Sequence, residues 1–500
     1  MDLKGKKVTV VGLARSGIGA ANILASMGAE VTVTDRQSDS QLSGAVRMLA
    51  PSVKCALGGH PDDVFNSAQL IVVSPGVPLE MSQIISAKTR GIPVIGELEL
   101  AYRILETEQR KEQRAKAGKL TQRPKHGGKI PFLAVTGSNG KSTTTTLLDR
   151  MLRKGGFRTL LGGNIGNALT EEILKTVNSE ESEVNSKGER YKSDDSLPDY
   201  IVVEVSSFQL DSIETFRPHI ASILNITPDH LDRYPSLAAY GGSKARIFEN
   251  QGKDDFLVLN ADDPEIEKIE HESLKKKTGV PQVFYFSRRK KVKGLYWRDG
   301  NVYCDIPHLS SPPDRPFVAE GEIRIKGIHN LENAMAASAM ALLAGCPQGA
   351  VIHSLAEFGG LEHRLEFVRE IDGVRYVNDS KGTNVGAVMK SVESFDGNVL
   401  LIAGGRDKAG DFRALRDLVS RKVKGLVLIG EAAGKIREAL GDVTDAVTAK
   451  DLRDAVAICR GKAAAGDVVL LSPACASFDM FRDFEDRGRQ FKKIVMELAG

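Results

Sequence analysis

The chain has 500 residues, with 68 lysines and arginines against 65 aspartates and glutamates, so its net charge is only +3. This balance gives no support to a nucleic-acid-binding or membrane-bound protein, and any anion site must be local. Five scattered cysteines without a Cys-x-x-Cys pair favour neither a disulfide framework nor a zinc knuckle. The length exceeds what one core usually serves, so we expect about three domains. Because no apolar run approaches the roughly 18 residues of a membrane span, we expect a cytoplasmic protein.

The first segment has the order strand, glycine turn, helix, strand, which predicts a Rossmann-like opening. Apolar residues 8–11 precede the turn, and residues 31–35 form the next strand. Ala14 stands where the Gly-x-Gly-x-x-Gly fingerprint has its middle glycine, while Asp35 ends the second strand. The segment therefore favours a nucleotide diphosphate over NAD, although a plain βα turn without a ligand also fits. Residues 74–76 end a further buried run and are a second candidate contact.

Two polar stretches interrupt this α/β pattern. Residues 105–129 are rich in Glu, Gln, Arg and Lys with few residues suited to a core, which predicts an exposed basic insertion between domains. A nucleic-acid arm is the alternative, but no aromatic residue is interleaved for stacking on bases. Residues 178–198 are rich in Ser, Glu, Lys and Asp, which predicts a flexible surface loop within a nucleotide-binding domain.

The central motif is an apolar strand, residues 131–135, followed by the glycine loop 136–143 and a helical pattern. Two glycines let backbone N–H groups turn inward, and the helix start aims its positive end at the same point, so the loop predicts a phosphate site. Lys141 suits the β- and γ-phosphates, and a loop hydroxyl suits Mg²⁺. The loop is shorter than a Walker A motif. The predicted nucleotide-binding residues are Gly137, Ser138, Asn139, Gly140, Lys141, Ser142 and Thr143.

Polar residues end the two strands that follow. Glu204 lies at the end of the buried run 200–204, and His230 lies in the run Thr227–Asp232 after residues 221–226. Oxygen-rich surroundings at one sheet edge suit Mg²⁺, with His230 as an unusual but workable ligand; two unrelated loop residues are the alternative. Lys244 belongs to an amphipathic helical stretch, and the residues alone predict a surface lysine.

Later segments add candidate contacts at strand and helix ends. The small-residue helix at 327–337 opens with amide side chains, including Asn333, that would cap the helix or reach a nucleotide base. From residue 361 a new βα-rich region begins, where Lys and Arg beside hydroxyls in the runs 362–364 and 376–384 suggest anion binding. Cys475 follows the last strand; a small packed residue is favoured there over a nucleophile, because nothing fixes a His partner.

Taken together, these motifs resemble the Mur ligases of peptidoglycan synthesis over nearly the whole chain. The loop 136–143 is shared across that superfamily, which includes folylpolyglutamate synthases. The runs Glu204–Leu210 and Leu471–Gly488 resemble the D-glutamate-adding branch. The insertions at 105–129 and 178–198 depart from the compact family pattern.

The resemblance implies an α/β fold of three domains. Residues 1–104 would be a Rossmann-like domain for a UDP substrate, 105–129 a linker, 130–360 a P-loop-type ATPase with a mostly parallel sheet, and 361–500 a Rossmann-like domain that closes over the site and binds D-glutamate. The implied reaction is ATP-dependent ligation of D-glutamate to UDP-N-acetylmuramoyl-L-alanine through an acyl phosphate, with two Mg²⁺ ions. Apart from the resemblance, we expect a monomer without nucleic-acid or membrane partners.

The resemblance also assigns roles to residues. The implied catalytic residues are Lys141, Glu204, His230, Lys244 and Arg364. Asn333, Arg364 and Asp379 would join the glycine loop in binding ATP. The metal ligands would be Ser142, Glu204, His230 and, as a carbamate, Lys244. The substrate contacts would be Ala14, Arg15, Ser16, Asp35, Arg36, Ser74 and Gly76 for UDP, Asn164 near the reacting carboxylate, and Lys381, Thr383, Lys408, Ser477 and Phe484 for D-glutamate.

Three rival interpretations stay open at this point. Another ligase of the superfamily would add a different amino acid, or glutamate to folate. An oxidoreductase would use the first βα unit for NAD. A nucleotide sensor would bind ATP without turning it over.

Overall fold

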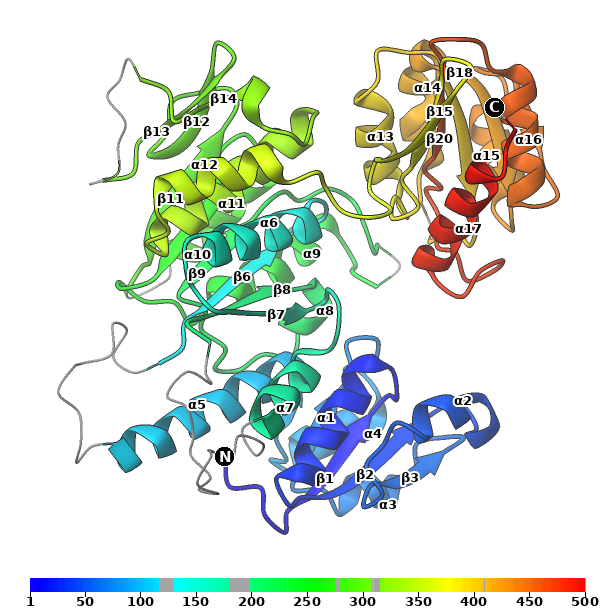
Figure 1. Ribbon diagram of the computed structural model, residues 1–500. Coiled ribbons are helices and arrows are strands. Elements are labelled where there is room, and N and C mark those ends of the chain that lie inside the picture. Colours follow the sequence, from blue (N-terminus) through cyan, green and yellow to red (C-terminus); the bar gives the residue numbers. More distant parts are fainter. Residues whose placement is uncertain are drawn as a thin grey trace, which may run out of the picture.

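The computed structural model describes residues 1–116, 129–179, 198–231, 233–275, 279–307, 309, 315–408 and 410–499. Residues 117–128 of the first predicted insertion and 180–197 of the second lie outside this range. Within it, the strands form three sheets, one in each successive part of the chain (Figure 1). The sheets are mostly parallel, and the predicted α/β fold class is confirmed.

The N-terminal sheet is parallel throughout, in the order β3-β2-β1-β4-β5. The chain crosses over between β1 and β4, and the loops after these two strands meet at their carboxyl ends. The elements are β1 (Lys7–Val11), α1 (Arg15–Ser26), β2 (Glu30–Asp35), α2 (Asp39–Val46), β3 (Lys54–Leu57), α3 (Asp62–Asn66), β4 (Leu70–Val73), α4 (Ser82–Thr89), β5 (Val94–Gly96) and α5 (Glu97–Lys116).

The central sheet has the order β14-β13-β12-β11-β10-β9-β6-β8-β7, with antiparallel pairing at β12-β13 and β13-β14. Strand β6 lies between β8 and β9, so the glycine loop, Glu204 and the segment after Ile223 share one edge. The elements are β6 (Phe132–Thr136), α6 (Lys141–Lys154), β7 (Thr159–Gly163), α7 (Leu169–Ser179), β8 (Tyr200–Glu204), α8 (Ser207–Leu210), β9 (Ile220–Ile223), α9 (Leu237–Ala245), η1 (Arg246–Phe248), β10 (Phe256–Asn260), α10 (Pro264–Leu274), β11 (Gln282–Ser287), β12 (Gly294–Arg298), β13 (Asn301–Cys304), β14 (Val318–Ala319), η2 (Glu320–Glu322), α11 (Ile328–Leu343) and α12 (Gln348–Glu357).

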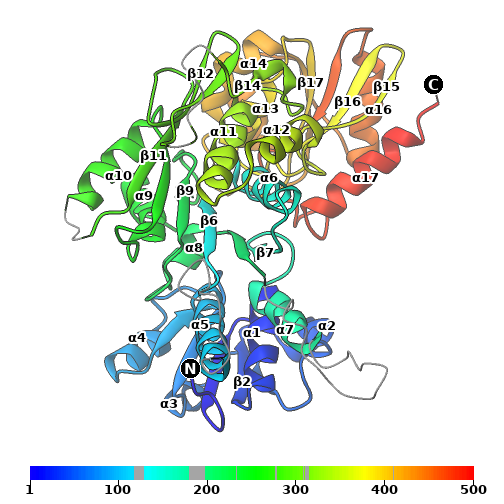
Figure 2. The same ribbon diagram turned by 60° about the vertical axis from the view of Figure 1, so that its left-hand side comes forward.

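The C-terminal sheet has the order β15-β16-β20-β17-β18-β19 and is parallel except at the β15-β16 hairpin. Helices cover both faces of this sheet (Figures 1 and 2). The elements are β15 (Glu366–Ile371), β16 (Val374–Asn378), α13 (Val385–Glu393), β17 (Val399–Gly404), η3 (Phe412–Leu415), α14 (Arg416–Lys422), β18 (Val423–Ile429), α15 (Ala433–Leu440), β19 (Ala446–Thr448), α16 (Leu452–Lys462), β20 (Val468–Leu471) and α17 (Phe484–Met496).

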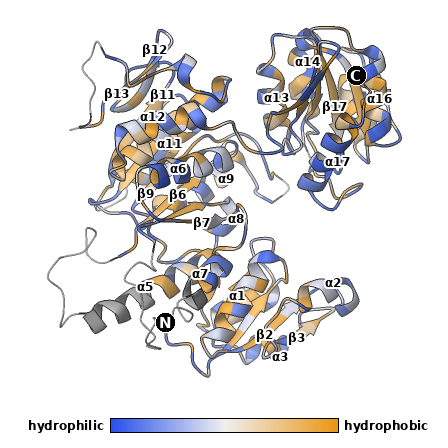
Figure 3. Ribbon diagram, viewed as in Figure 1, coloured by the Kyte–Doolittle hydropathy of each residue, from blue (hydrophilic) through white to orange (hydrophobic). Residues whose placement is uncertain are grey.

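Hydrophobic residues are concentrated in the strands of the three sheets (Figure 3). One buried cluster runs without a break from the N-terminal sheet into the central sheet, through α5 and α7, which pack against α1. Leu105 belongs to this cluster, so helix α5 carries core side chains into the stretch from which the sequence predicted an exposed insertion. The C-terminal sheet has separate clusters on its two faces. Among the described residues, no buried apolar cluster joins the C-terminal domain to the rest.

The hydropathy of the helices shows whether any of them could span a membrane. In the described part of the chain, no helix is long and apolar enough to cross a bilayer.

Candidate active site

A cavity of about 350 Å³ lies where the central and C-terminal domains meet. Its walls come from the glycine loop, the ends of β8 and β9, the start of α11, and the C-terminal segments after residue 364. The residues predicted from the sequence that line it are Ser138, Asn139, Gly140, Lys141, Ser142, Asn164, Glu204, His230, Asn333, Arg364, Asp379, Lys381, Thr383, Lys408 and Phe484. Residues from two domains therefore share one pocket.

The glycine loop is held in shape by the segment after β9. Asn225 Oδ1 accepts the N–H of Asn139 (2.8 Å), and Asn225 Nδ2 donates to the carbonyl of Asn139 (3.0 Å). Gly140 has φ 85°, and a Cβ on it would lie 2.2 Å from Asn333 Oδ1. Helix α6 begins here with no acidic residue in its first turn, so its N–H groups are available to an anion.

Lys141 folds back over its own loop. Its Nζ donates to the carbonyls of Gly137 (2.8 Å) and Ser138 (3.0 Å). Burial lowers the pKa of Lys141, and the nearby carboxylates of Glu204 and Asp229 oppose that shift. Ser142 and Thr143 are buried beneath the loop, and Ser142 reaches the cavity wall.

Glu204 supplies a buried carboxylate with a vacant acceptor. Its Oε1 accepts Asn164 Nδ2 (2.9 Å), whereas Oε2 has no hydrogen-bond partner among the described residues. His230 has a left-handed backbone, φ 55°, and its N–H donates to Asp229 Oδ1 (3.0 Å). Asp229 lines the same cavity. This Glu204 oxygen belongs to a cavity that Asp229 and Ser142 also line, and such an oxygen-rich set fits a hard cation such as Mg²⁺.

The structure corrects the prediction of a surface position for Lys244. The side chain is 1% exposed, because α9 packs it beneath the glycine loop. Its Nζ donates to the carbonyl of Gly137 (3.0 Å) and lies 4.4 Å from the ring centroid of Tyr240. Burial lowers the pKa of Lys244 well below its usual value, and the Lys141 ammonium, which shares the Gly137 carbonyl, lowers it further.

The C-terminal wall is fixed by Asp379. Its Oδ2 accepts the hydroxyls of Ser391 (2.6 Å) and Ser472 (2.7 Å), and its Oδ1 accepts the N–H of Leu365 (3.2 Å). Burial raises the pKa of Asp379, and these hydrogen bonds oppose the shift. Arg364 precedes Leu365, and its Nε has no partner among the described residues. The arginine therefore has an unused donor at the cavity.

The residues assigned to D-glutamate also belong to the C-terminal domain. Lys381 Nζ lies 4.8 Å from the ring centroid of Phe484, and burial lowers the pKa of Lys381. Ser477 is buried, at 2% exposed, but does not line the cavity. Burial raises the pKa of Cys475 to about 12, which favours the packed residue over the nucleophile.

Several cavity residues were not assigned from the sequence. Asn384 Nδ2 donates to Asp229 Oδ2 (2.9 Å) and so joins the C-terminal domain to the central one. The other unassigned residues at the wall include His329, Glu332 and Lys390. His329 and Glu332 lie within one turn of the predicted Asn333 on α11, so helical spacing could have indicated them, whereas Asn384 and Lys390 belong to a distant part of the chain.

The seven residues assigned to UDP do not line this cavity. They belong to the carboxyl ends of β1, β2 and β4, around the first glycine loop. Asp35 Oδ2 accepts the N–H of Leu13 (2.8 Å), and Oδ1 accepts that of Gln37 (2.9 Å). Both carboxylate oxygens of Asp35 therefore bind backbone N–H groups of the loops that follow β1 and β2. Arg15 Nη1 reaches the carbonyl of Gly166 (3.3 Å), in the loop that carries Asn164.

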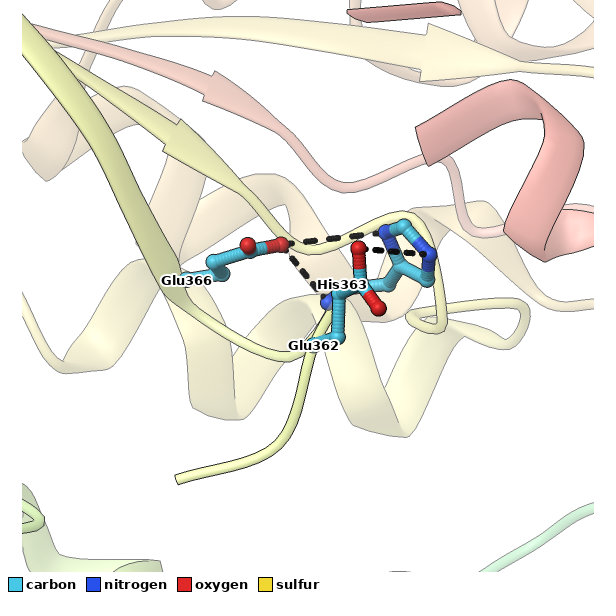
Figure 4. A group of neighbouring side chains, drawn as sticks. All are labelled: Glu362, His363 and Glu366. Atoms are coloured by element: carbon cyan, nitrogen blue, oxygen red, sulfur yellow. Dashed lines mark hydrogen bonds and ion pairs between the residues drawn. The ribbon is translucent and has the colours of Figure 1, made fainter. Parts of the chain in front are cut away.

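A second group of potential metal ligands comes from residues next to Arg364 in the sequence: Glu362, His363 and Glu366 (Figure 4). Lys492 Nζ already contacts both carboxylates, at 2.8 Å from Glu362 and 2.5 Å from Glu366. Asn378 Nδ2 lies 2.9 Å from His363 Nδ1. The ammonium contacts both carboxylates and offsets part of their negative charge, so the group is explained without a metal ion.

The fold and the cavity define a nucleotide-binding α/β enzyme whose site is shared by two domains. Family models match three parts of the chain: the Mur ligase MurD-like N-terminal domain at residues 6–96, the Mur ligase middle domain at 135–341, and the Mur ligase glutamate ligase domain at 363–475. The chain belongs to the Mur ligase family. The resemblance inferred from the sequence is thereby confirmed.

Individual proteins agree with this assignment. The UDP-N-acetylmuramoylalanine–D-glutamate ligase of Geotalea daltonii is 44% identical over 100% of this chain and 99% of its own length. The protein of the same name from Geotalea uraniireducens is 42% identical, over 100% and 99%. Among solved structures, UDP-N-acetylmuramate-alanine ligase MurC of Thermotoga maritima superposes with a TM-score of 0.54 at 17% identity, covering 98% of this chain and 99% of that chain, and shares the fold.

Proposed function

We propose that the protein joins D-glutamate to UDP-N-acetylmuramoyl-L-alanine, using ATP and releasing ADP and phosphate, in cytoplasmic peptidoglycan precursor synthesis. The observation that carries the proposal is the cavity itself. It combines a phosphate loop, a Glu204 oxygen that accepts no hydrogen bond from the described part of the chain, and the basic residues Arg364, Lys381 and Lys408 of another domain. Full-length similarity to ligases named for D-glutamate supports the choice of amino acid.

ATP is proposed to bind across the glycine loop and α11. Helix α6 offers its N–H groups to the phosphates, Lys141 offers an ammonium, and Asn333 lies against Gly140 on the nucleoside side. Ser142, Glu204, His230 and the carbamate of Lys244 would hold two Mg²⁺ ions. The ions would neutralise charge on the transferring phosphoryl group.

The first step is transfer of the γ-phosphoryl group to the L-alanine carboxylate of the UDP substrate, which gives an acyl phosphate and ADP. Lys141 and Arg364 face this point from opposite domains and stabilise the negative charge that develops there. Asn164, hydrogen-bonded to Glu204, would orient the reacting carboxylate. Charge stabilisation by fixed groups is where such sites gain most of their rate.

The second step is attack by the D-glutamate amine on the acyl phosphate, with release of phosphate. Lys381, Thr383, Lys408, Ser477 and Phe484 are proposed to bind D-glutamate. Ser477 is the weakest member of this set, because it lies outside the cavity wall. Closure of the C-terminal domain would keep water from the acyl phosphate.

The UDP end is proposed to bind in the N-terminal domain, at Ala14, Arg15, Ser16, Asp35, Arg36, Ser74 and Gly76. Helix α1 begins at Arg15 without an acidic residue in its first turn, which suits a diphosphate. We also propose that the protein acts as a monomer, since one chain carries residues for all three substrates.

The test is phosphate release from ATP and Mg²⁺ with UDP-N-acetylmuramoyl-L-alanine, in the presence of D-glutamate, L-glutamate or neither. We expect release to require both the nucleotide sugar and D-glutamate. A requirement for another amino acid or for folate would replace the substrate assignment with that of another ligase of the superfamily. ATP binding without any release would support a sensor, and protection by NADH would support the oxidoreductase.

A catalytically impaired variant completes the test. Lys141→Ala removes the ammonium from the phosphate loop, and we expect a loss of about 100-fold or more in kcat, as for other removed transition-state contacts. Lys154→Ala, in the same helix, is the matched control because Lys154 lies on the surface beside Glu357. Full turnover in Lys141→Ala would contradict the assignment of the loop.

A further inference from the structure

Arg233 connects the N-terminal and central domains through a forked contact. Its Nη1 donates to the carbonyl of Pro75 (3.2 Å), and its Nη2 donates to the carbonyl of Val77 (3.2 Å). The arginine follows the His230 turn in the central domain, whereas both acceptors belong to the loop after β4. The planar guanidinium thus donates two hydrogen bonds to one loop. Two bonds fix the orientation of the loop relative to Arg233 as well as the distance between them.

The loop after β4, to which Arg233 donates, forms part of the proposed UDP pocket. The N–H of Val77 donates to the carbonyl of Ser74 (3.0 Å), which closes a tight turn. Ser74 Oγ donates to the carbonyl of Gly12 (2.9 Å), in the first glycine loop. A Cβ on Gly12 would lie about as close to Val77 as to Ser74, at 3.1 and 3.0 Å. Movement of the loop after β4 would therefore also move the first glycine loop, and these two loops form the pocket.

The other side of Arg233 reaches the proposed magnesium site. Its guanidinium carbon lies 4.2 Å from the ring centroid of Phe208. Phe208 meets His230 edge-on at 4.8 Å between ring centroids and stacks on Tyr234 at 5.9 Å. The N–H of Arg233 donates to the carbonyl of His230 (3.0 Å). Arg233, Phe208 and His230 form one packed unit.

The charge of Arg233 has no counter-ion among the described residues. Its acceptors are two neutral carbonyls, so the guanidinium is used for its geometry and not for an ion pair. A lysine in place of Arg233 would keep the positive charge but could not reproduce the paired hydrogen bonds from one planar group. This difference separates an electrostatic role from a positioning role.

We propose that Arg233 is a positioning residue that fixes the loop Ser74–Val77 against the His230 turn, and thereby sets the separation between the UDP pocket and the reacting carboxylate. The inference rests on the proposed function. One extended substrate must then reach both places at once, so a loose connection would misplace its carboxylate relative to the phosphoryl group. Misplacement near 1 Å costs up to about 100-fold in rate.

The first experiment compares Arg233→Lys with the wild type in steady-state kinetics. We expect kcat/KM for the UDP substrate to fall about tenfold, with the KM values for ATP and D-glutamate within about twofold of wild type. Arg246→Lys is the matched control, because Arg246 also donates to a backbone carbonyl, that of Ile213 (2.8 Å), away from the cavity. The control is expected to retain wild-type kinetics.

The second experiment is a double-mutant cycle with Phe208→Leu. If the two side chains act as one unit, the loss in kcat/KM of the double variant will be smaller than the product of the two single losses. Thermal shifts with the UDP substrate alone provide a reading without catalysis. We expect Arg233→Lys to reduce the protection by that substrate and to leave the protection by ATP unchanged.

Defined results would overturn the inference. They are wild-type kinetics in Arg233→Lys, KM values that rise equally for all three substrates, additive losses in the cycle, or a variant that fails to fold, which would make Arg233 a stability residue. Failure of the proposed function is separate, because it would appear in the wild type as release without need for the nucleotide sugar.

Discussion

Lys244 shows at the scale of one residue how burial can change chemistry. A buried ammonium next to a second ammonium, that of Lys141, is disfavoured, so the side chain tends toward the neutral amine, which is the form that reacts with CO₂. The carbamate formed is an anion and suits a metal-binding pocket.

We therefore expect removal of CO₂ and bicarbonate to lower the rate of phosphate release, and added bicarbonate to restore it. Lys244→Ala should be inactive and indifferent to bicarbonate. The measurement is turnover in degassed buffer with and without bicarbonate, with Lys253→Ala as a control at an exposed lysine. An active Lys244→Ala variant, or a wild type indifferent to bicarbonate, would count against the carbamate.

His329 gives a second prediction at the residue scale. Burial, with Lys390 and Arg364 nearby, lowers the pKa of His329 to about 3. The unfolded chain would protonate this histidine near pH 6.5, whereas the folded protein keeps it neutral. Between these pH values the unfolded state binds more protons, so stability is lost as the pH falls from about 6.5 toward 3.

The measurement is the melting temperature from pH 7.5 to 4.5. We expect His329→Asn to lose less melting temperature on acidification than the wild type. His353→Asn is the control, because His353 is half exposed and pairs with Glu357 at the surface. Parallel curves for His329→Asn and the wild type would show that His329 does not carry this pH dependence.

At the scale of elements, the strand β6, its loop and α6 depend on a glycine that the sequence already singled out. Gly140 and Gly156 have similar left-handed backbones, φ 85° and 88°, but a Cβ would collide with Asn333 only at Gly140. Each alanine carries the strain of a left-handed backbone, about 1 kcal/mol. In Gly140→Ala, the contact of the new Cβ with Asn333 would in addition push the glycine loop and α11 apart.

We expect Gly140→Ala to lose the thermal protection that ATP gives, whereas Gly156→Ala shows a small fall in melting temperature and full protection. The assay is a thermal shift titration with ATP and Mg²⁺. Equal ATP protection in both variants would mean that the contact between Gly140 and Asn333 does not shape the nucleotide site.

Much of each element could be predicted from hydrophobic runs. Residues 8–11 and 31–35 lie within β1 and β2, and Glu204 ends β8 as expected. The run 221–226 was predicted as a strand, but β9 ends at Ile223, because Asn225 turns to brace the glycine loop. The burial of Lys244 was missed, since a charged residue on a short helix gives no local sign of what will pack above it.

Local sequence patterns predict the cavity even less completely than the individual elements. The glycine loop has a local signature because its chemistry depends on consecutive residues. Asp229 and Asn384 are 155 positions apart, and Arg233 contacts carbonyls 156 and 158 positions away. Contacts between domains are set by how the sheets pack, and one sequence carries no periodic signal for them.

At the scale of the whole molecule, the domains are joined in two different ways. A continuous apolar cluster joins the N-terminal and central domains, whereas the C-terminal domain has its own clusters and meets the cavity through polar side chains. Apolar interfaces resist movement, and smaller polar interfaces permit it. We therefore expect movement chiefly of the C-terminal domain, with the hydrogen bond from Asn384 to Asp229 favouring the closed arrangement.

Asn384→Asp tests this expectation. Asn384 Oδ1 caps α13 by accepting the N–H of Ala387 (2.7 Å), a role that an aspartate retains. The new carboxylate would instead face Asp229, and like charges repel most at low salt. We expect kcat to fall about tenfold, with partial recovery at higher ionic strength, and the radius of gyration with bound ligands to exceed that of the wild type in solution scattering. Asn384→Ser keeps a capping oxygen without the charge and should lose less. Equal activity and equal dimensions for the wild type and Asn384→Asp would show that closure does not depend on this contact.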